Sequence, residues 1–148
     1  MIYTPLTKKA LKLCFESHKD QVDKSGMPYV FHPFHLAEQM EDEISTVCAL
    51  LHDVVEDTHY TLKDLEEMGY PAAVIEVLAL LNHEDPVPYM DYVREIARNP
   101  VARKVKLADL AHNSDVTRMD MVDEKALKRC AKYAEARKLL MEYEGIEV

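Results

Sequence analysis

The amino-acid sequence predicts an all-α fold, and three observations support this prediction. The 148 residues include only three glycines, apolar residues rarely alternate with polar ones as they do in strands, and residues that start or stop helices recur along the chain. The composition, 48% hydrophobic and 30% charged, is that of a globular protein. A chain of this length can bury a core of its own, so we expect one helical domain over residues 1–148.

The first expected helix begins near the N-terminus and is followed by a loop. Thr4 suits the N-cap position and Pro5 suits the first helical position. The apolar residues expected on this helix are Leu6, Ala10, Leu13 and Phe15. Residues 20–29 contain the turn-forming pair Ser25-Gly26 and are expected to form a loop.

The rest of the chain reads as helices joined by short connections. A short helix is expected to begin with a capping box at Thr61 and to end at Gly69. The polar segment 82–87, which contains Pro86, is a connector. The other expected helices cover residues 30–39, 44–55, 72–81, 88–97, 100–112 and 123–143. No internal repeat, low-complexity tract or linker divides the chain.

The acidic balance of the chain limits its binding partners. A net charge of −9 argues against a nucleic-acid-binding surface, which would be basic. It allows a small anionic substrate, because a few cations and a metal in one cleft act locally.

The cysteines and the apolar runs indicate a cytoplasmic protein. Cys14, Cys48 and Cys130 are widely spaced and form no CxxC motif, which is typical of reduced thiols, and Cys48 is expected to pack in the core. The N-terminus lacks the pattern of a signal peptide. No apolar run is long enough to cross a bilayer, so no membrane partner is expected.

Four ionisable side chains interrupt the apolar stretch 47–58, namely His52, Asp53, Glu56 and Asp57. If this stretch is helical, the four occupy a sector of about 140° and the other residues can face a core. Carboxylates and an imidazole are costly to bury beside a core unless they are paired, hydrogen-bonded or bound to metal. A metal site is the simplest explanation.

The candidate metal ligands are His32, His52, Asp53 and Asp109. Two imidazoles and two carboxylates leave open positions on an octahedral ion, which favours a hydrolytic metal over a closed structural zinc. The alternative is that each is an ordinary buried histidine or surface carboxylate. That alternative weakens because all four interrupt apolar helices.

Several motifs together give the chain a family resemblance. They are His18 with Gln21, the segment 24–29 (KSGMPY), His32-Pro33, the segment 50–58 (LLHDVVEDT), and the segment 105–109 (VKLAD) with Asn113. With these motifs, which cover about residues 4–118, the chain resembles the HD superfamily of metal-dependent phosphohydrolases. It is most similar to the hydrolase domain of the RelA/SpoT proteins and their short single-domain relatives. Those enzymes remove the 3′-pyrophosphate of guanosine tetra- and pentaphosphate.

The resemblance implies a helical HD-type bundle with one divalent ion, usually Mn²⁺, on the four candidate ligands. It also implies that Glu56 and Asp57 position or deprotonate the attacking water. As plain surface acids near a helix C-terminus they would oppose the macrodipole. Lys24, Lys106 and Asn113 would bind the nucleotide. Ordinary solvation is the alternative for Lys106.

The chain departs from the family pattern at a few positions. Asp23 precedes Lys24 where the relatives have an Arg-Lys pair, and Asp20 and Leu110 replace a glycine and an arginine. An anion at position 23 removes a cationic stacking group and is expected to repel a polyanion near this loop. The metal ligands are unaffected by these changes.

The remaining histidines and tyrosines are interpreted more simply. Surface or packing roles are expected for His35, His59, His83 and His112. His18 is expected to pack or hydrogen-bond beneath the loop. Tyr89 and Tyr92 either line the cleft or pack, and packing is favoured.

Three functions remain open from the sequence. The first is a Mn²⁺-dependent (p)ppGpp 3′-pyrophosphohydrolase, the second an HD-type phosphohydrolase of another nucleotide, and the third a non-catalytic nucleotide-binding sensor. Retention of both Glu56 and Asp57 argues against the sensor. The chain contains no GxxxxGK[ST] motif and has no room for a nucleotide-synthesising domain.

Overall fold

The computed structural model describes residues 1–145, and over this range the chain forms helices and no β-strand. The one β-type pairing among these residues is an isolated bridge between Val22 and Pro28. The prediction of an all-α fold is therefore confirmed. None of the described helices is long and apolar enough to span a membrane. The elements in chain order are α1 (Pro5–His18), α2 (Phe31–Glu38), α3 (Glu43–Leu51), α4 (Val54–Asp57), α5 (Leu62–Glu67), α6 (Ala72–Leu81), α7 (Tyr89–Ala97), α8 (Pro100–Asn113), the 3-10 helix η1 (Val116–Arg118) and α9 (Glu124–Glu144).

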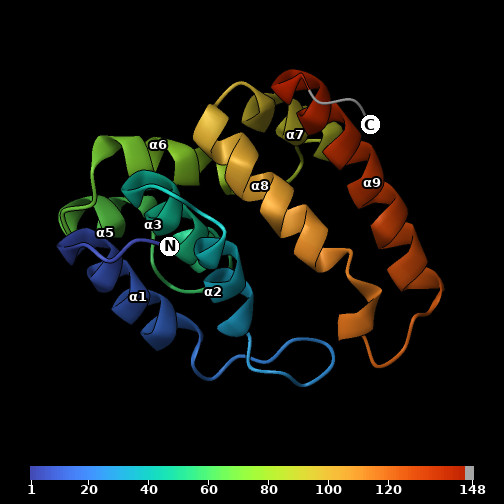
Figure 1. Ribbon diagram of the computed structural model, residues 1–148, viewed down its shortest axis with the longest axis horizontal. Helices are drawn as coiled ribbons and strands as arrows, with labels where there is room; N and C mark the ends of the chain where they lie inside the picture. The colour runs from blue at the N-terminus through green and yellow to red at the C-terminus, as the bar shows by residue number, and fades with distance from the viewer. Residues whose placement is uncertain (146–148) are drawn as a thin grey trace.

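Helix α3 lies at the centre of the core. Residues 45–51 of this helix are all buried, as expected for a helix that is apolar on every side. It packs against α1, α2, α6 and α8, and Figure 1 shows it enclosed by these neighbours. A segment that follows α3 directly is therefore held by the best-packed part of the molecule.

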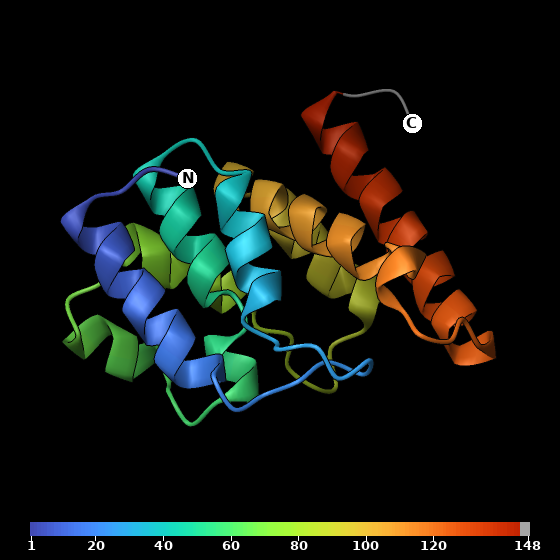
Figure 2. The same cartoon turned by 60° about the horizontal axis from the view of Figure 1, so that its bottom comes forward.

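Helix α8 joins this core to the C-terminal helices. It packs against α3 and α6 on one side and against α7 and α9 on the other. In Figure 2 the C-terminal end of α9 projects away from the body of the molecule. Side chains on α8 can therefore face both the core and the space between α8 and α9.

Most helix starts and ends follow the sequence signals. Thr4 and Thr7 form a capping box at the start of α1, with Pro5 in the first turn, and Thr61 starts α5 in the same way with Asp64. The predicted helices 30–39, 72–81, 88–97, 100–112 and 123–143 agree with the structure to within one residue at each end.

Phe15 lies on α1 as expected, but it is not on the buried face of this helix. Phe15 is 54% exposed, and the adjacent Cys14 faces the core instead. Cys48 is fully buried, as predicted.

The prediction of one helix over residues 44–55 is wrong, because this segment forms two helices. Helix α3 ends at Leu51, His52 is its C-cap, and α4 begins at Val54. Between them Asp53 has φ −105° and ψ 1°, a sparsely populated region of backbone space in which active-site residues are often found. The apolar pattern continues across the break, so periodicity alone could not reveal it. His52 keeps a helical backbone conformation, and the break changes the direction of the chain at Asp53.

Candidate metal centre and substrate cavity

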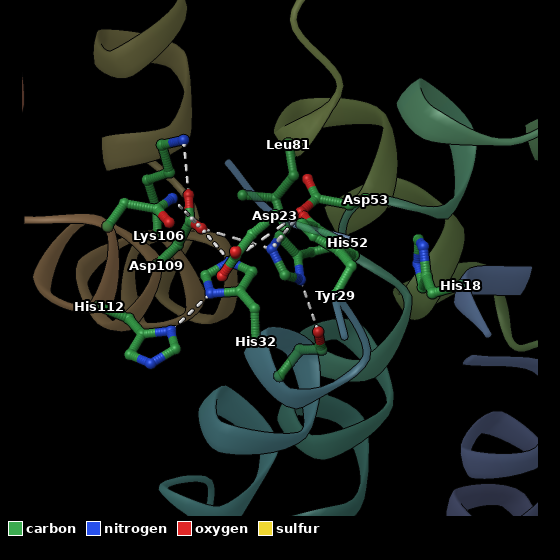
Figure 3. A network of polar contacts seen from close by, with 12 residues as sticks. His18, Asp23, Tyr29, His32, His52, Asp53, Leu81, Lys106, Asp109 and His112 are labelled. Atoms are coloured by element: carbon green, nitrogen blue, oxygen red, sulfur yellow. Dashed lines mark hydrogen bonds and ion pairs between the residues drawn. The ribbon is translucent and has the colours of Figure 1, made fainter. Parts of the chain in front are cut away.

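The four candidate metal ligands meet at one point, although they come from α2, the α3–α4 junction and α8 (Figure 3). One ligand atom from each of His32, His52, Asp53 and Asp109 lies within 4.8 Å of the others. His32 Nε2 is 2.8 Å from Asp109 Oδ1, and His52 Nε2 is 2.9 Å from Asp53 Oδ2. This spacing allows two imidazole nitrogens and two carboxylates to surround one divalent ion.

The orientation of His52 fits a metal ligand. Its Nδ1 donates a hydrogen bond to the carbonyl oxygen of Ala49 at 2.7 Å, which leaves the Nε2 lone pair directed at the cluster. His52 Nε2 is buried and has no hydrogen bond of acceptable geometry. The nitrogen lies 2.9 Å from Asp53 Oδ2 and 3.4 Å from Asp109 Oδ1, and a cation bound among these atoms would give it a well-directed partner.

Neighbouring side chains orient the two carboxylates. The Tyr29 hydroxyl donates to Asp53 Oδ2. Lys106 Nζ donates to Asp109 Oδ2 at 2.9 Å, and Asn113 Nδ2 donates to Asp109 Oδ1 at 3.0 Å. Partners of this kind fix the geometry of metal ligands and tune their affinity. Two residues predicted to bind substrate, Lys106 and Asn113, thus contact a candidate metal ligand.

The charges at the cluster stabilise one another. Burial would raise the pKa of Asp109, but Lys106 and the two histidines hold it well below its usual range. Burial would likewise raise the pKa of Asp53, whereas the adjacent His52 lowers it to about 2. Burial would lower the pKa of His52, but the carboxylates raise it well above its usual value. A metal ion that binds His52 must therefore displace a proton, which makes binding weaker at low pH.

A cavity of about 560 Å³ opens in front of the cluster, within the range of small-molecule sites. The carboxylates that line the cavity are Asp23, Asp53, Glu56, Asp57, Asp109 and Asp115. The cations that line the cavity are Lys24, Lys106, Arg118 and Arg129, and the aromatic residues are Tyr29 and Tyr133. Candidate metal ligands and four cations around one cavity suit a ligand with several phosphate groups.

Glu56 and Asp57 lie at the cavity end of α4, next to the candidate ligands. Partial burial, aided by Asp53, raises the pKa of Asp57, and burial also raises that of Glu56. The Glu56 carboxylate accepts the backbone N–H of His83. A carboxylate with a raised pKa beside a metal site is suited to accept a proton.

The structure gives Asp23 a role in its own loop. Asp23 Oδ1 accepts the backbone N–H groups of Ser25 and Met27 at 2.9 and 3.1 Å. Its other oxygen lies 3.8 Å from the Arg118 guanidinium. The expected repulsion of a polyanion by Asp23 is therefore offset by Arg118, which also lines the cavity.

Most of the simpler interpretations of the aromatic residues agree with the structure. His18 is buried and hydrogen-bonded to Gln21 at 2.8 Å, and His59 lies against Tyr60. The Tyr92 hydroxyl donates to the carbonyl oxygen of Leu81 at 2.7 Å, which is a packing role.

Sequence reasoning missed His112. Its Nδ1 lies 2.7 Å from Nδ1 of His32, so it contacts a candidate ligand directly. Burial and the nearby Arg118 lower the pKa of His112 to about 4, which keeps the imidazole neutral. His112 is three residues from Asp109, which places both on one helix face. This spacing could have indicated from the sequence that His112 lies near the candidate ligands.

Other cavity residues also escaped prediction. Arg118, Arg129 and Tyr133 line the cavity from η1 and α9. In sequence they resemble surface residues of amphipathic helices, and only the packing of α9 against α8 brings two of them to the site. Tyr29 belongs to the KSGMPY segment, but nothing in its sequence context specifies a bond to Asp53.

Comparison with known proteins reveals related sequences. No protein-family model matches the chain. It is 30% identical over 135 residues to a probable GTP pyrophosphokinase of Mycobacterium leprae, an alignment that covers 83% of this chain and 17% of that protein. It is 32% identical over 123 residues to the bifunctional (p)ppGpp synthase/hydrolase SpoT of Escherichia coli, covering 72% of this chain and 17% of SpoT. The chain thus spans about a sixth of the length of these relatives.

A solved structure shares the fold over nearly the whole chain. It belongs to a metazoan ortholog of SpoT that hydrolyses ppGpp and acts in starvation responses. The TM-score is 0.72 at 22% sequence identity, and the match covers 97% of this chain and 87% of the other. At this identity the match establishes the common helical fold.

Proposed function

We propose that this chain, which belongs to the RelA/SpoT-type HD domains, is a metal-dependent hydrolase that removes the 3′-pyrophosphate from ppGpp and pppGpp. One observation carries the proposal most strongly. Two histidines and two aspartates converge within 4.8 Å, and the cavity beside them is also lined by four cationic side chains, Lys24, Lys106, Arg118 and Arg129. The names of the relatives, which include ppGpp 3′-pyrophosphohydrolases, support the choice of nucleotide. The whole domain is proposed to occupy residues 1–148 and to act in the cytoplasm.

The proposed ligands of the ion are His32, His52, Asp53 and Asp109, and the proposed ion is Mn²⁺. Mixed imidazole and carboxylate donors with open positions suit a first-row divalent metal. When bound, the ion lowers the pKa of water and neutralises charge on phosphoryl oxygens. The residues around it keep the ligands in place: Tyr29 holds Asp53, and Lys106 with Asn113 holds Asp109.

Glu56 and Asp57 are proposed as the catalytic carboxylates. Both line the cavity beside Asp53, where they can orient the attacking water and take its proton. Their raised pKa values make them better proton acceptors than ordinary surface acids. The fixed position of Glu56, which accepts the N–H of His83, favours an orienting role for it and leaves Asp57 as the proton acceptor.

The nucleotide is proposed to contact the cationic side chains that line the cavity. Lys24 on the loop and Asn113 on α8 retain their proposed roles in binding it, and Lys106 contributes charge while it pairs with Asp109. Arg118 supplies a guanidinium to the same cavity next to Asp23. A second candidate, hydrolysis of another phosphorylated nucleotide, is favoured by Asp23, because Asp23-Lys24 stands where the family has an Arg-Lys pair.

The test is an assay of product release from a panel of nucleotides. Purified protein with Mn²⁺ is incubated with ppGpp, pppGpp, nucleoside monophosphates and nucleoside triphosphates, and pyrophosphate and phosphate are measured separately. Release of pyrophosphate from ppGpp supports the proposal. Phosphate from another nucleotide would favour the second candidate, and binding without any product would favour a sensor.

Two controls connect activity to the site. Asp109→Ala should abolish turnover; it also lowers the stability, because it removes the partner of Lys106, so circular dichroism at the assay temperature must show that the variant is still helical. Asp91→Ala changes an exposed carboxylate on α7 and should leave turnover unchanged. Equal loss in both variants would show that the assay reports folding and not the metal centre.

A further inference from the structure

We propose that His112 is a positioning residue that holds His32 in the tautomer and orientation needed to bind the metal ion through Nε2. The inference rests on the proposed metal centre. The two Nδ1 atoms are 2.7 Å apart, and the ring planes differ by only 4° with centroids 5.0 Å apart. Figure 3 shows His112 on the side of the His32 ring away from Asp109.

The hydrogen-bond pattern fixes which nitrogen carries each proton. His32 Nε2 faces the cluster, 2.8 Å from Asp109 Oδ1 and 4.0 Å from Asp53 Oδ2. A metal ion on this nitrogen requires its lone pair, so the His32 proton must be on Nδ1. His112 Nδ1 must then accept that proton, which requires a neutral His112 with its own proton on Nε2.

Helix α8 therefore contacts both nitrogens of one ligand. Asp109 and His112 are three residues apart and share a face of this helix, and they lie at the Nε2 and Nδ1 ends of His32. His32 is only 2% exposed, so no bulk water is available to replace either partner.

His112 is held by contacts to its ring and to its backbone. The ring of His35 lies against it with centroids 4.1 Å apart. Arg118 donates a hydrogen bond to the His112 carbonyl oxygen at 2.8 Å, which fixes the end of α8 at this residue. An acceptor with a fixed position can select one tautomer of its donor, as the partners of metal-binding histidines generally do.

Mn²⁺ affinity measured without nucleotide separates this role from simple packing. His112→Asn places an amide oxygen close to the position of Nδ1 and can still accept the His32 proton. His112→Phe keeps a ring of similar size but has no acceptor. Loss of such a partner costs about 10–100-fold in metal affinity. The Kd for Mn²⁺ should therefore rise by about 10–100-fold in the Phe variant and by less than about threefold in the Asn variant. The electron paramagnetic resonance signal of free Mn²⁺ measures both values.

The outcomes are distinct. An unchanged Kd in His112→Phe, or an equal loss in both variants, would overturn the proposal, because ring packing would then account for the contact. His35→Ala, which removes the neighbouring ring but no hydrogen bond to His32, should change the Kd much less than His112→Phe does. Binding of Mn²⁺ without hydrolysis of ppGpp would contradict the proposed function and leave this inference intact. No binding of Mn²⁺ by the unchanged chain would contradict both.

A second measurement does not depend on the stability of any variant. With Zn²⁺ as a diamagnetic probe ion, the ¹⁵N chemical shifts of His32 should show a protonated Nδ1 and a metal-bound Nε2, and those of His112 should show protonation at Nε2. Coordination of the ion through His32 Nδ1 would exclude the role proposed for His112.

Discussion

Asp109 shows how the site is built at the scale of single residues. Its carboxylate faces His32 and accepts hydrogen bonds from Lys106 and Asn113, so a fully buried anion is surrounded by donors. An isolated ionised carboxylate would not remain charged in such a place. The carboxylate is thereby prepared to bind a cation before one arrives.

Glu56→Gln and Asp57→Asn should separate chemistry from metal binding. Each is expected to lower kcat by about 100-fold, the usual scale for a group that handles a proton, while the Kd for Mn²⁺ stays within a few-fold. Because both pKa values are raised, their ionised forms destabilise the fold as pH rises through those values. The variants should therefore unfold at the same temperature as the original chain at neutral pH, or slightly higher. Glu67→Gln, an exposed acid of α5, is the control, and unchanged kcat in both site variants would return these acids to a surface role.

Lys106→Met should destabilise the metal-free protein. Lys106 pairs with Asp109 at 2.9 Å, and both side chains are largely buried. Removing one partner of a buried pair costs about 3–5 kcal/mol, which should appear as a lower free energy of unfolding in urea. Mn²⁺ should restore part of the lost free energy of unfolding, because the ion neutralises the charge of Asp109. Lys104→Met on the same helix changes a half-buried lysine away from the cluster and should cost much less. Similar losses in both variants would mean that the ion pair contributes little.

The residues that sequence could predict are those whose chemistry conflicts with their surroundings. A histidine or aspartate inside an apolar helix is visible in the sequence, and His52, Asp53 and Asp109 were found in this way. Arg118 and Tyr133 are normal residues in normal sequence surroundings, and they reach the cavity only through tertiary packing.

At the scale of elements, short polar segments between well-packed helices determine the shape of the site. Side-chain N-caps mark the starts of α1, α3, α5, α8 and α9. Helices α2, α6 and α7 begin without such a hydrogen bond, so capping explains only part of the agreement between predicted and observed bounds. The break after Leu51 was not predicted because its causes are local and tertiary: His52 bonds to Ala49, and Asp53 bonds to Tyr29 of a distant loop.

Asp42→Ala should destabilise α3 and with it the support of His52. Asp42 is the N-cap of α3, and its carboxylate accepts the N–H of Ser45 at 2.8 Å. Loss of such a cap costs about 1 kcal/mol, a fall in Tm of about 3 °C for a chain of this size. Asp42→Asn retains an acceptor and should lose much less.

The effect of Asp42 has a defined pH dependence. The hydrogen bond from the backbone of Ser45 lowers the pKa of Asp42, so its stabilisation is fully present above the ordinary aspartate pKa of about 3.9 and is lost as pH falls through the lower folded value. The difference in unfolding free energy between the original chain and Asp42→Ala should therefore narrow between pH 5 and pH 3. A difference that stays constant over this range would show that the charge of Asp42 has no part in the cap.

In the loop that contains Asp23, we expect removal of this anion to weaken nucleotide binding, which is the opposite of what charge repulsion alone would predict. Asp23→Ala removes the acceptor for two backbone N–H groups and the neighbour of Arg118. If the loop binds nucleotide, KM for ppGpp should rise about fivefold, the equivalent of about 1 kcal/mol. Asp23→Asn, which keeps an acceptor, and Asp20→Ala, which changes an exposed residue, should have little effect. A tenfold lower KM in Asp23→Arg would instead support repulsion as the main effect of this anion.

At the scale of the whole molecule, the metal centre connects parts of the chain that are distant in sequence. His32 comes from α2, His52 and Asp53 from the junction after α3, and Asp109 from α8. Helices α7 and α9 also pack against α8. Figure 1 shows α8 between the N-terminal helices and α9. An ion at this point therefore links the two groups of helices on either side of the cavity.

Binding of an ion to the folded state alone must stabilise the whole domain. At a free Mn²⁺ concentration of 100 times the Kd the gain is about 2.7 kcal/mol, which corresponds to a rise in Tm of about 8 °C. Differential scanning calorimetry with and without Mn²⁺ measures this rise, and Asp109→Asn should abolish it even though that variant starts from a lower Tm. Asp91→Asn, an exposed carboxylate on α7, should keep the full rise. Hydrogen exchange should then slow in α2, α3 and α8 together, because all three supply or support ligands. Protection confined to α3 and α4 would mean that the ion binds only the His52-Asp53 pair and does not join the two halves of the molecule.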